Sequence, residues 1–315
     1  MLKTINRYVA TFSNRQALAF AEFIANAHSI GEVIAEARRI ANRLPGSKRK
    51  PRTWKWSFHR FADMLESGEL PHCIFELKGN TKLPFAAFST LPIVTCPGAG
   101  ACAGIANAGD APNLSEAYCY SLRAWRYPAA FLRQCQNTLL LRFNRRAIID
   151  AFQSLPNDIT LRLYVDGDFD SESTALFWFN LLRQRQDVSC YGYSKSWDIL
   201  LALSDRVPTN YVLNISCGSI HDADIELKAI MLALPFVRGQ FIAVQIEGSF
   251  PRGFARFADA DYHKAVRDAA SKLGIVKSFS CPGQCGGCTS LGHACGSKRD
   301  DGRFVVPCTI AIGVH

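Results

Sequence analysis

Residues 160–194, TLRLYVDGDFDSESTALFWFNLLRQRQDVSCYGYS, decide the fold class of this chain of 315 residues. Residues 160–165 and 189–194 are short segments of apolar and aromatic side chains, and each predicts a strand. Residues 171–186 lie between them and predict a helix. Since a strand, a helix and a second strand in this order pair in parallel through a right-handed crossover, the stretch predicts an α/β fold.

The same alternation continues on both sides of this stretch. Further strands are predicted at residues 73–77, 88–94, 211–216, 241–247 and 276–280, and further helices at residues 128–154, 197–205, 225–234 and 261–273. Five or six such units predict a full or partial parallel (β/α) barrel, and a doubly wound open sheet is the alternative. In parallel barrels the functional side chains follow the strands, so the candidates are sought at the predicted strand ends.

The predicted barrel core spans residues 71–280 and is flanked by two other segments. Residues 1–70 form a predicted N-terminal helical appendage, because apolar side chains recur at spacings of three and four over residues 14–44. Residues 26–31 divide that region into two helices, and a third helix is predicted at residues 57–66. Residues 281–315 form a predicted cysteine-rich metal-binding segment.

Composition excludes several classes of protein. A chain that is 48% hydrophobic and 20% charged can bury a sizeable core, which excludes a disordered protein. No 18 consecutive residues are apolar, and the N-terminus lacks the apolar region of a secretory signal. We therefore expect a cytoplasmic protein without a membrane partner, and the sequence leaves its oligomeric state open.

Positive charge is concentrated in residues 38–60, which hold nine lysines and arginines and no acidic residue. That number equals the formal net charge of +9 for the whole chain. Cations with tryptophans between them suit phosphate contact and base stacking, so this segment predicts a nucleic-acid contact. The candidate contact residues are Lys48, Arg49, Lys50, Arg52, Trp54, Lys55 and Trp56. A solvated linker, with the tryptophans on a strand laid against a core, is the alternative.

Twelve cysteines include a run with the spacing of metal ligands. Cys281-x3-Cys285-x2-Cys288-x6-Cys295 places four thiols in a loop rich in glycine, which lets the backbone fold tightly around one centre. Short gaps of two and three residues favour a [4Fe–4S] cluster. Zinc is the alternative, although structural zinc sites usually show two Cys-x2-Cys pairs.

A second group of thiols follows the predicted strand at residues 88–94. Cys96, Cys102 and Cys119 could hold or complete another metal centre, with a fourth position left for water, substrate or a distant cysteine. Cys73 and Cys308 are candidates for that position. The alternative is that Cys96 and Cys102 are loop thiols and Cys119 belongs to the core.

Charged residues also follow the next two predicted strands. Asp166 and Asp168 come after residues 160–165, where carboxylates could hold Mg²⁺ or orient a substrate or cofactor. Asp170 or Ser171 is predicted to cap the following helix. Lys195 follows residues 189–194 and could bind an anion or balance a carboxylate, whereas a solvent-facing lysine is the alternative. We take Asp166, Asp168 and Lys195 as the candidate catalytic residues.

Several motifs together resemble those of the phage and plasmid gene product 88 family, over about residues 74–310. The motifs are Gly79-Asn-Thr-Lys-Leu83, Phe88-Ser-Thr-Leu-Pro92, Thr95-Cys-Pro-Gly-Ala99, Cys102, Cys119-Tyr120, Asp166-Gly-Asp-Phe-Asp-Ser171, Trp178, Tyr191-Gly-Tyr-Ser-Lys-Ser196 and the cysteines at 281–295. The resemblance implies origin in a mobile genetic element.

The layout is also distantly similar to radical S-adenosylmethionine barrels, which would imply S-adenosylmethionine as a cofactor. Cys96, Cys102 and Cys119 stand where those barrels carry a three-cysteine loop, and residues 166–168 stand where they carry a Gly-Gly-Glu-like motif. The spacing Cys-x3-Cys-x2-Cys itself occurs here at residues 281–288 instead.

Three functions are consistent with these patterns. The first is an iron–sulfur protein of a phage or plasmid that acts on or with nucleic acid, with a radical S-adenosylmethionine-like enzyme as its catalytic form. The second is a non-catalytic DNA-binding accessory protein with a structural zinc or iron–sulfur site. The third is a Mg²⁺-dependent nuclease built on Asp166, Asp168 and Asp170. The sequence specifies neither the substrate nor the reaction.

Overall fold

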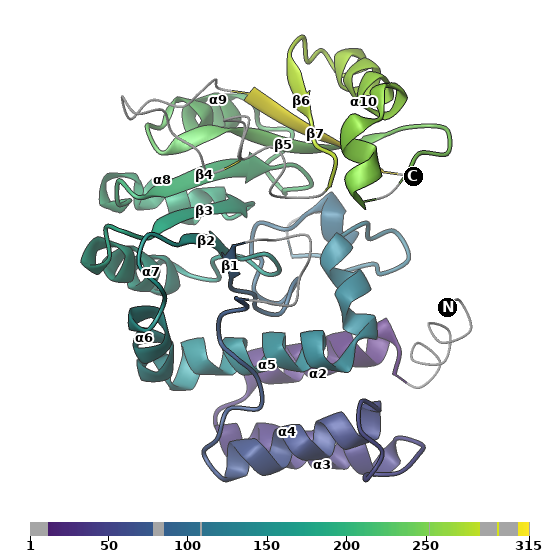
Figure 1. Cartoon of the computed structure of the whole chain (residues 1–315), viewed down its shortest axis with the longest axis vertical. Coiled ribbons are helices and arrows are strands. Elements are labelled where there is room, and N and C mark those ends of the chain that lie inside the picture. The colour runs from purple at the N-terminus through teal and green to yellow at the C-terminus, as the bar shows by residue number, and fades with distance from the viewer. Residues whose placement is uncertain are drawn as a thin grey trace. The chain divides into compact units, whose positions relative to one another are not determined.

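The structure is a computed structural model that describes residues 12–77, 85–107, 109–251, 253–283, 295 and 308–314. The chain folds into two compact units (Figure 1). The helical unit comprises Met1–Phe75, Phe88–Leu155 and Asp166–Asp170, and the sheet unit comprises Glu76–Ala87, Pro156–Val165 and Ser171–His315. Among the described residues, no helix has both the length and the apolar character needed to cross a bilayer.

The helical unit contains five α-helices and two short 3₁₀ helices within its described residues. They are α2 (Asn14–Asn26), α3 (Ile30–Arg43), α4 (Trp54–Glu66), η1 (Ala101–Ala103), η2 (Tyr120–Arg126), α5 (Pro128–Phe143) and α6 (Arg145–Gln153). Side-chain caps set where the first helices begin: Ser13 forms a capping box with Gln16, and Ser29 caps α3. The two helices predicted within residues 14–44 are therefore confirmed.

The third helix begins three residues earlier than predicted, because Thr53 caps it and Trp54 is its first residue. The indole of Trp54 is 2% exposed and lies 4.6 Å from the ring of Phe12, centroid to centroid. It also packs against Phe58 and Phe131 in the core of the helical unit. The prediction that Trp54 stacks on a base is therefore wrong: its ring is used in the core.

The boundary predicted at residue 70 does not separate two units. Helices α2 and α4 pack against α5, so residues 12–65 share one hydrophobic core with residues 91–139. Phe131 of α5 is fully buried between rings of the N-terminal helices, 6.2 Å from Phe20 and 5.9 Å from Trp54. The sequence pattern predicted the N-terminal helices, but α5, the helix against which they pack, lies about 70 residues further along the chain.

Within its described residues, the sheet unit has seven parallel strands in the order β1-β2-β3-β4-β5-β7-β6. They are β1 (Ala86–Ala87), β2 (Thr160–Leu163), β3 (Ser189–Ser194), β4 (Tyr211–Ser216), β5 (Val237–Gln245), β6 (Ser278–Ser280) and β7 (Cys308–Val314). Its helices are α7 (Glu172–Gln184), α8 (Trp197–Ala202), η3 (Ser204–Arg206), α9 (Ile225–Ala233), η4 (Gly253–Ala258) and α10 (Ala260–Lys272). The predicted α/β class with parallel strands is confirmed. The described strands form an open sheet, since β1 and β6 are its two ends.

Two predicted strands are wrong. Residues 73–77 contribute an isolated antiparallel bridge from Glu76 to Ala87, and residues 88–94 form turns after the two-residue strand β1. Pro92 lacks an amide donor, and Ile93 has a φ of 71°, a left-handed conformation that no strand contains. Conversely, β7 near the C-terminus was not predicted. It pairs with both β5 and β6.

The register gives the sheet two chemically different faces. Residues paired across parallel strands point to the same side, so Leu161, Cys190 and Tyr211 share one face, on which the ring of Phe179 from α7 lies 5.8 Å from that of Tyr211. Helix α10 packs on that side as well, through Tyr262. The opposite face, here called the polar face, carries Arg162, Tyr191, Tyr193, Asn214 and Phe241.

Candidate functional site

The polar face of the sheet unit collects side chains from four neighbouring strands. The guanidinium of Arg162 on β2 lies 4.9 Å from the ring centre of Tyr193 on β3, and the ring of Phe241 on β5 lies 5.0 Å from the same ring. Asn214 of β4 is paired with Tyr193 in the register and is fully buried. A cationic, an aromatic and an amide side chain therefore adjoin one another on the face opposite α7 and α10.

Two of the four cysteines predicted as metal ligands reach this face. The side-chain amide of Asn214 donates a hydrogen bond of 2.8 Å to the carbonyl of Cys295. Burial raises the pKa of Tyr193, and the negative charges of the Cys295 and Cys281 thiolates raise it further, against the opposing effect of Arg162. Cys295 is therefore tied to β4 at this face, and Cys281 acts electrostatically on the same phenol. The other two predicted ligands, Cys285 and Cys288, lie outside the described residues.

Cys281 is positioned by the end of β6. Its amide donates a 2.7 Å hydrogen bond to the carbonyl of Ala311 on β7, and its carbonyl accepts one of 2.8 Å from the hydroxyl of Tyr262. Its sulfur accepts a contact of 3.4 Å from the amide of Gly283, whose φ of 74° turns the chain. The backbone on both sides of this thiol is therefore fixed before the loop begins.

Lys195 lies at the same edge of the sheet, where β3 ends. Its ammonium group is 3.0 Å from the hydroxyl of Ser216 at the end of β4, and its carbonyl accepts a hydrogen bond from Ser219. The residue after Ser216, Cys217, has a raised pKa, chiefly because it is buried. Lys195 is thus held against the sheet edge and is not a freely solvated lysine, although its catalytic role stays a prediction.

The acidic motif belongs to the helical unit and is anchored there by a buried amide. Gln134 of α5, 2% exposed, donates a 2.9 Å hydrogen bond from its side chain to the carboxylate of Asp166. Its oxygen accepts one of 2.9 Å from the indole of the buried Trp125. The carbonyl of Asp166 accepts another from the amide of Thr90. This chain of contacts fixes the position of the Asp166 carboxylate.

Asp168 and the residues after it are fixed by their own backbone. The carboxylate of Asp168 is 3% exposed and accepts a 2.8 Å hydrogen bond from the amide of Phe169. Ser171 accepts a hydrogen bond from the amide of Thr174, which confirms the predicted cap of α7. Among the described residues, no group of three or more His, Cys, Asp or Glu side chains could hold a metal ion. The Mg²⁺ site predicted at Asp166, Asp168 and Asp170 stays a prediction.

The second group of cysteines lies in the helical unit around a tight turn. The amide of Cys119 donates a 2.9 Å hydrogen bond to the carbonyl of Cys102, and Cys96 and Cys102 pack into one small apolar cluster. Gly104 follows with a φ of 69°, and a Cβ there would lie 2.2 Å from the carbonyl oxygen of Asn113. The turn brings these segments together, but the three thiols form no metal-binding group. The second metal centre stays a prediction.

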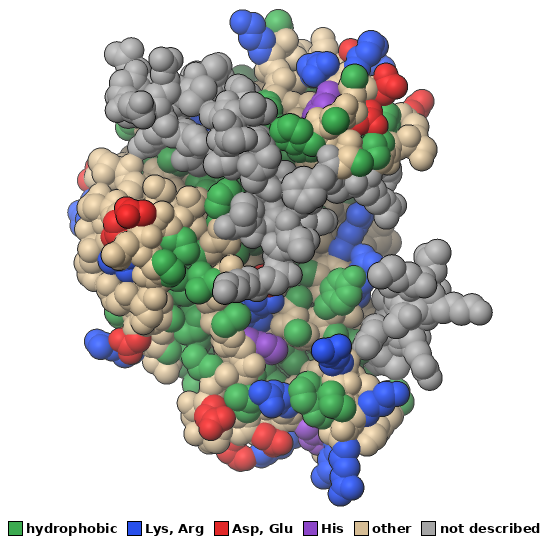
Figure 2. All heavy atoms as spheres, in the orientation of Figure 1, with side chains coloured by type: hydrophobic (Ala, Val, Ile, Leu, Met, Phe, Trp, Pro, Cys, Tyr) green, Lys and Arg blue, Asp and Glu red, His purple; other side chains and the backbone are tan. Residues whose placement is uncertain are grey.

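The basic segment is partly neutralised within the helical unit. Arg38 forms ion pairs with Asp63 and Glu66, and Lys55 donates a hydrogen bond to the carbonyl of Leu44. Lys48, Arg49 and Lys50 are exposed between α3 and α4. On the face drawn in Figure 2, basic side chains lie beside apolar ones over the α3–α4 end of this unit. The exposed cations are those best placed for phosphate contact.

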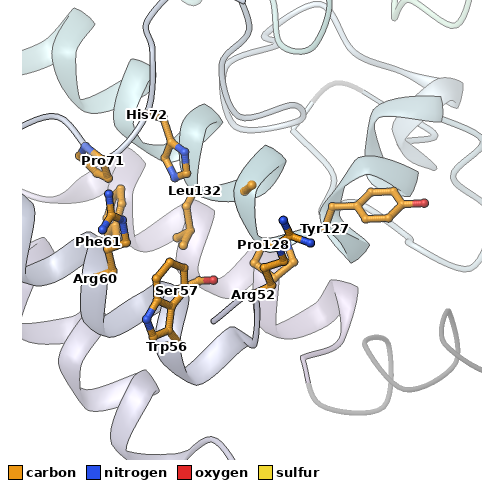
Figure 3. A pocket seen from close by; sticks show the side chains of 11 residues that line it. Arg52, Trp56, Ser57, Arg60, Phe61, Pro71, His72, Tyr127, Pro128 and Leu132 are labelled. Carbon is orange, nitrogen blue, oxygen red and sulfur yellow. The ribbon is translucent and has the colours of Figure 1, made fainter. Parts of the chain in front are cut away.

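Next to this segment the helical unit contains a cavity of about 530 Å³. Figure 3 shows the residues around it, which come from α4, from the segment at residues 71–72 and from the start of α5. Trp56, Arg60, His72 and Tyr127 are among them. Sequence reasoning singled out Trp56 and missed the other three, because residues 72 and 127 reach α4 only through the fold.

His72 is held in its neutral form. Burial, together with the positive charges of Arg133 and Arg60, lowers its pKa from about 6.5 to about 4. Between these values the unfolded chain binds a proton that the folded chain does not, so we expect stability to fall by up to about 3 kcal/mol as the pH drops from 6.5 to 4. Urea unfolding across this pH range should show that the stability of His72→Gln depends less on pH than that of the wild type. If the stability of His72→Gln changes with pH as steeply as that of the wild type, the pH dependence belongs to other groups.

Comparison with known proteins identifies a family. A family model described as gene product 88 matches residues 62–290, which cover both the acidic motif and most of the C-terminal cysteine run. No curated protein and no solved structure matches the chain.

Proposed function

We propose that this chain, which belongs to the gene product 88 family, is an iron–sulfur protein of a mobile genetic element that acts on or with nucleic acid. One observation carries the proposal. Cys281 and Cys295, which are 14 positions apart in the sequence, are both hydrogen-bonded through their backbone to the same sheet: Cys281 donates to the carbonyl of Ala311 on β7, and Cys295 accepts from the side chain of Asn214 on β4. A loop with the ligand spacing of a cluster, whose two outer cysteines are tied to one sheet, suits a centre held by thiolates.

The donor set fits such a centre. Cys281, Cys285, Cys288 and Cys295 would hold a [4Fe–4S] cluster, which supplies one-electron chemistry when bound. The hydrogen bond from Asn214 to Cys295 and that from Cys281 to Ala311 would hold two ligands in place from outside the cluster. We further propose that the polar face is the inner side of a partial barrel, into which this centre faces.

Within this proposal the candidate catalytic residues keep their predicted roles. Asp166 and Asp168 would orient a substrate or a cofactor such as S-adenosylmethionine, and Lys195 would balance negative charge. The rigid anchoring of Asp166 by Gln134 supports a positioning role, since a carboxylate that must bind in one orientation gains from being fixed beforehand.

Elemental analysis tests the proposal directly. Protein purified without oxygen should contain about four iron atoms and four acid-labile sulfides per chain and absorb broadly near 400 nm. Cys281→Ser and Cys295→Ser should each remove most of the iron, whereas Cys135→Ala, at a cysteine of α5 outside both predicted groups, should keep it. A folded protein without metal would overturn the proposal.

The basic segment favours a second candidate, a non-catalytic DNA-binding accessory protein in which the same cysteines hold zinc. Exposed Lys48, Arg49 and Lys50 would supply its contact with phosphate. Stoichiometric zinc without sulfide, lost in Cys281→Ser, would support this alternative over the iron–sulfur proposal.

A further inference from the structure

We propose that the cavity beside Trp56 in the helical unit binds a base of single-stranded nucleic acid. The inference rests on the proposed function and deepens it, because it names where the nucleic acid is held and in which form. The cavity lies among α4, residues 71–72 and the start of α5, and its volume of about 530 Å³ falls within the usual range of small-molecule sites.

Two aromatic rings at this cavity are available for stacking. Trp56 is half-buried, and Tyr127 is 53% exposed. An arginine also lies beside each ring. The guanidinium of Arg60 is 5.6 Å from the ring centre of Trp56, and that of Arg126 is 5.9 Å from the ring centre of Tyr127. Aromatic rings with cations beside them are the usual platform for unpaired bases, which offer a flat face whatever their sequence.

The remaining walls match a base as well. Phe61 and Leu132 are buried and supply an apolar surface. His72 is fixed by a pair of hydrogen bonds between its backbone and the side chain of Gln136, each of 2.9 Å. Its neutral imidazole offers one donor and one acceptor. In Figure 3 the His72 ring lies beside Leu132, on the other side of the drawn space from Trp56.

Charge favours nucleic acid over other apolar occupants. Arg52 and Arg60 line the cavity, and none of its described lining residues is acidic. Arg52 ends the exposed basic stretch that includes Lys48, Arg49 and Lys50, so cations continue from the cavity along the neighbouring loop. A strand whose base enters the cavity would place its phosphates against these cations.

Binding of labelled oligonucleotides to the full-length protein tests this assignment. Fluorescence anisotropy should show tighter binding of a single strand of about 20 nucleotides than of a duplex of the same length. Trp56→Ala and Tyr127→Ala should each weaken single-strand binding about tenfold, the usual effect of losing one stacked base. Arg60→Ala should reduce the steepness of log K against log salt concentration by about one, the change expected for the loss of one phosphate contact.

Matched controls separate the cavity from general effects. Tyr118→Ala removes a tyrosine that is 47% exposed and does not line the cavity, and Arg15→Ala removes an exposed cation of the same unit. Both should bind as the wild type does. Circular dichroism checks folding, and Trp56→Leu replaces Trp56→Ala if the latter is unfolded.

The outcomes distinguish the two proposals. If the wild type binds single strands but the Trp56 and Tyr127 variants bind them equally well, the cavity assignment fails while nucleic-acid binding stands. Equal affinity of the wild type for single strand and duplex also overturns the assignment. If the wild type binds no nucleic acid, that part of the proposed function fails together with this inference, whereas the metal analysis is unaffected.

Discussion

Gly167→Ala is expected to destabilise the protein by at least about 3 kcal/mol. Gly167 lies between Asp166 and Asp168 with a φ of 81°, a conformation that L side chains adopt at a cost. A Cβ there would lie 1.9 Å from the hydroxyl oxygen of Thr90 and 2.8 Å from that of Thr95. The two threonines are buried and hydrogen-bonded to each other, so they cannot move aside without breaking that contact. Urea unfolding measures the loss.

Gly46→Ala is the matched control, because Gly46 has a φ of 98° but no atom within 4 Å of where a Cβ would lie. It should cost only about 1 kcal/mol, which is the effect of the backbone conformation alone. Thr90→Ala in the Gly167→Ala background removes the nearest atom and should recover part of the difference. A Gly167→Ala protein as stable as Gly46→Ala would show that Thr90 does not press on this loop.

Several strands and helices of the sheet unit could be predicted from local patterns in the sequence. The bounds of β3 and β4 are those predicted, residues 189–194 and 211–216, and α7, α9 and α10 lie within two residues of their predicted ends. Each is a short apolar or amphipathic segment ended by a polar cap or a turn, which local chemistry defines. Parallel pairing followed from their alternation along the chain.

Elements that depend on distant partners could not be predicted in the same way. Residues 88–94 have the composition of a strand, but the left-handed Ile93 and the hydrogen bond from the amide of Leu91 to Thr138 of α5 make them a turn. β7 becomes a strand because β5 and β6 flank it. Tertiary contacts override local preference at both places.

In the candidate site, too, some residues could be predicted from the local sequence and others are brought together only by the fold. Strand ends indicated Asp166, Lys195 and Cys281, since functional side chains in parallel folds follow the strands. Arg162 and Asn214 were missed, although a polar residue within an apolar strand is itself a signal of a partner across the sheet. Gln134 could not be found, because its partners Trp125 and Asp166 lie on either side of it in sequence and meet only in the fold.

Gln134→Glu is expected to cost about 2–4 kcal/mol near neutral pH. The new carboxylate would still accept the hydrogen bond from the indole of Trp125. Its second oxygen, however, would replace the amide nitrogen that lies 2.9 Å from the carboxylate of Asp166 in the wild type, so two carboxylates would face each other. Like charges in a partly buried site raise each other's pKa. The folded protein would then hold a proton that the unfolded chain releases above about pH 4.3, so the loss of stability should shrink as the pH falls from about 7.5 towards 5.

The double variant Gln134→Glu/Asp166→Asn reverses donor and acceptor and supplies the control. Its asparagine amide can donate to the new carboxylate, so most of the stability at about pH 7.5 should return and the new pH dependence should disappear. Urea unfolding of the wild type, both single variants and the double variant at about pH 7.5 and pH 5.5 gives the coupling energy. Additive effects would mean that Gln134 does not hold Asp166, and the fixed carboxylate on which its positioning role depends would be lost.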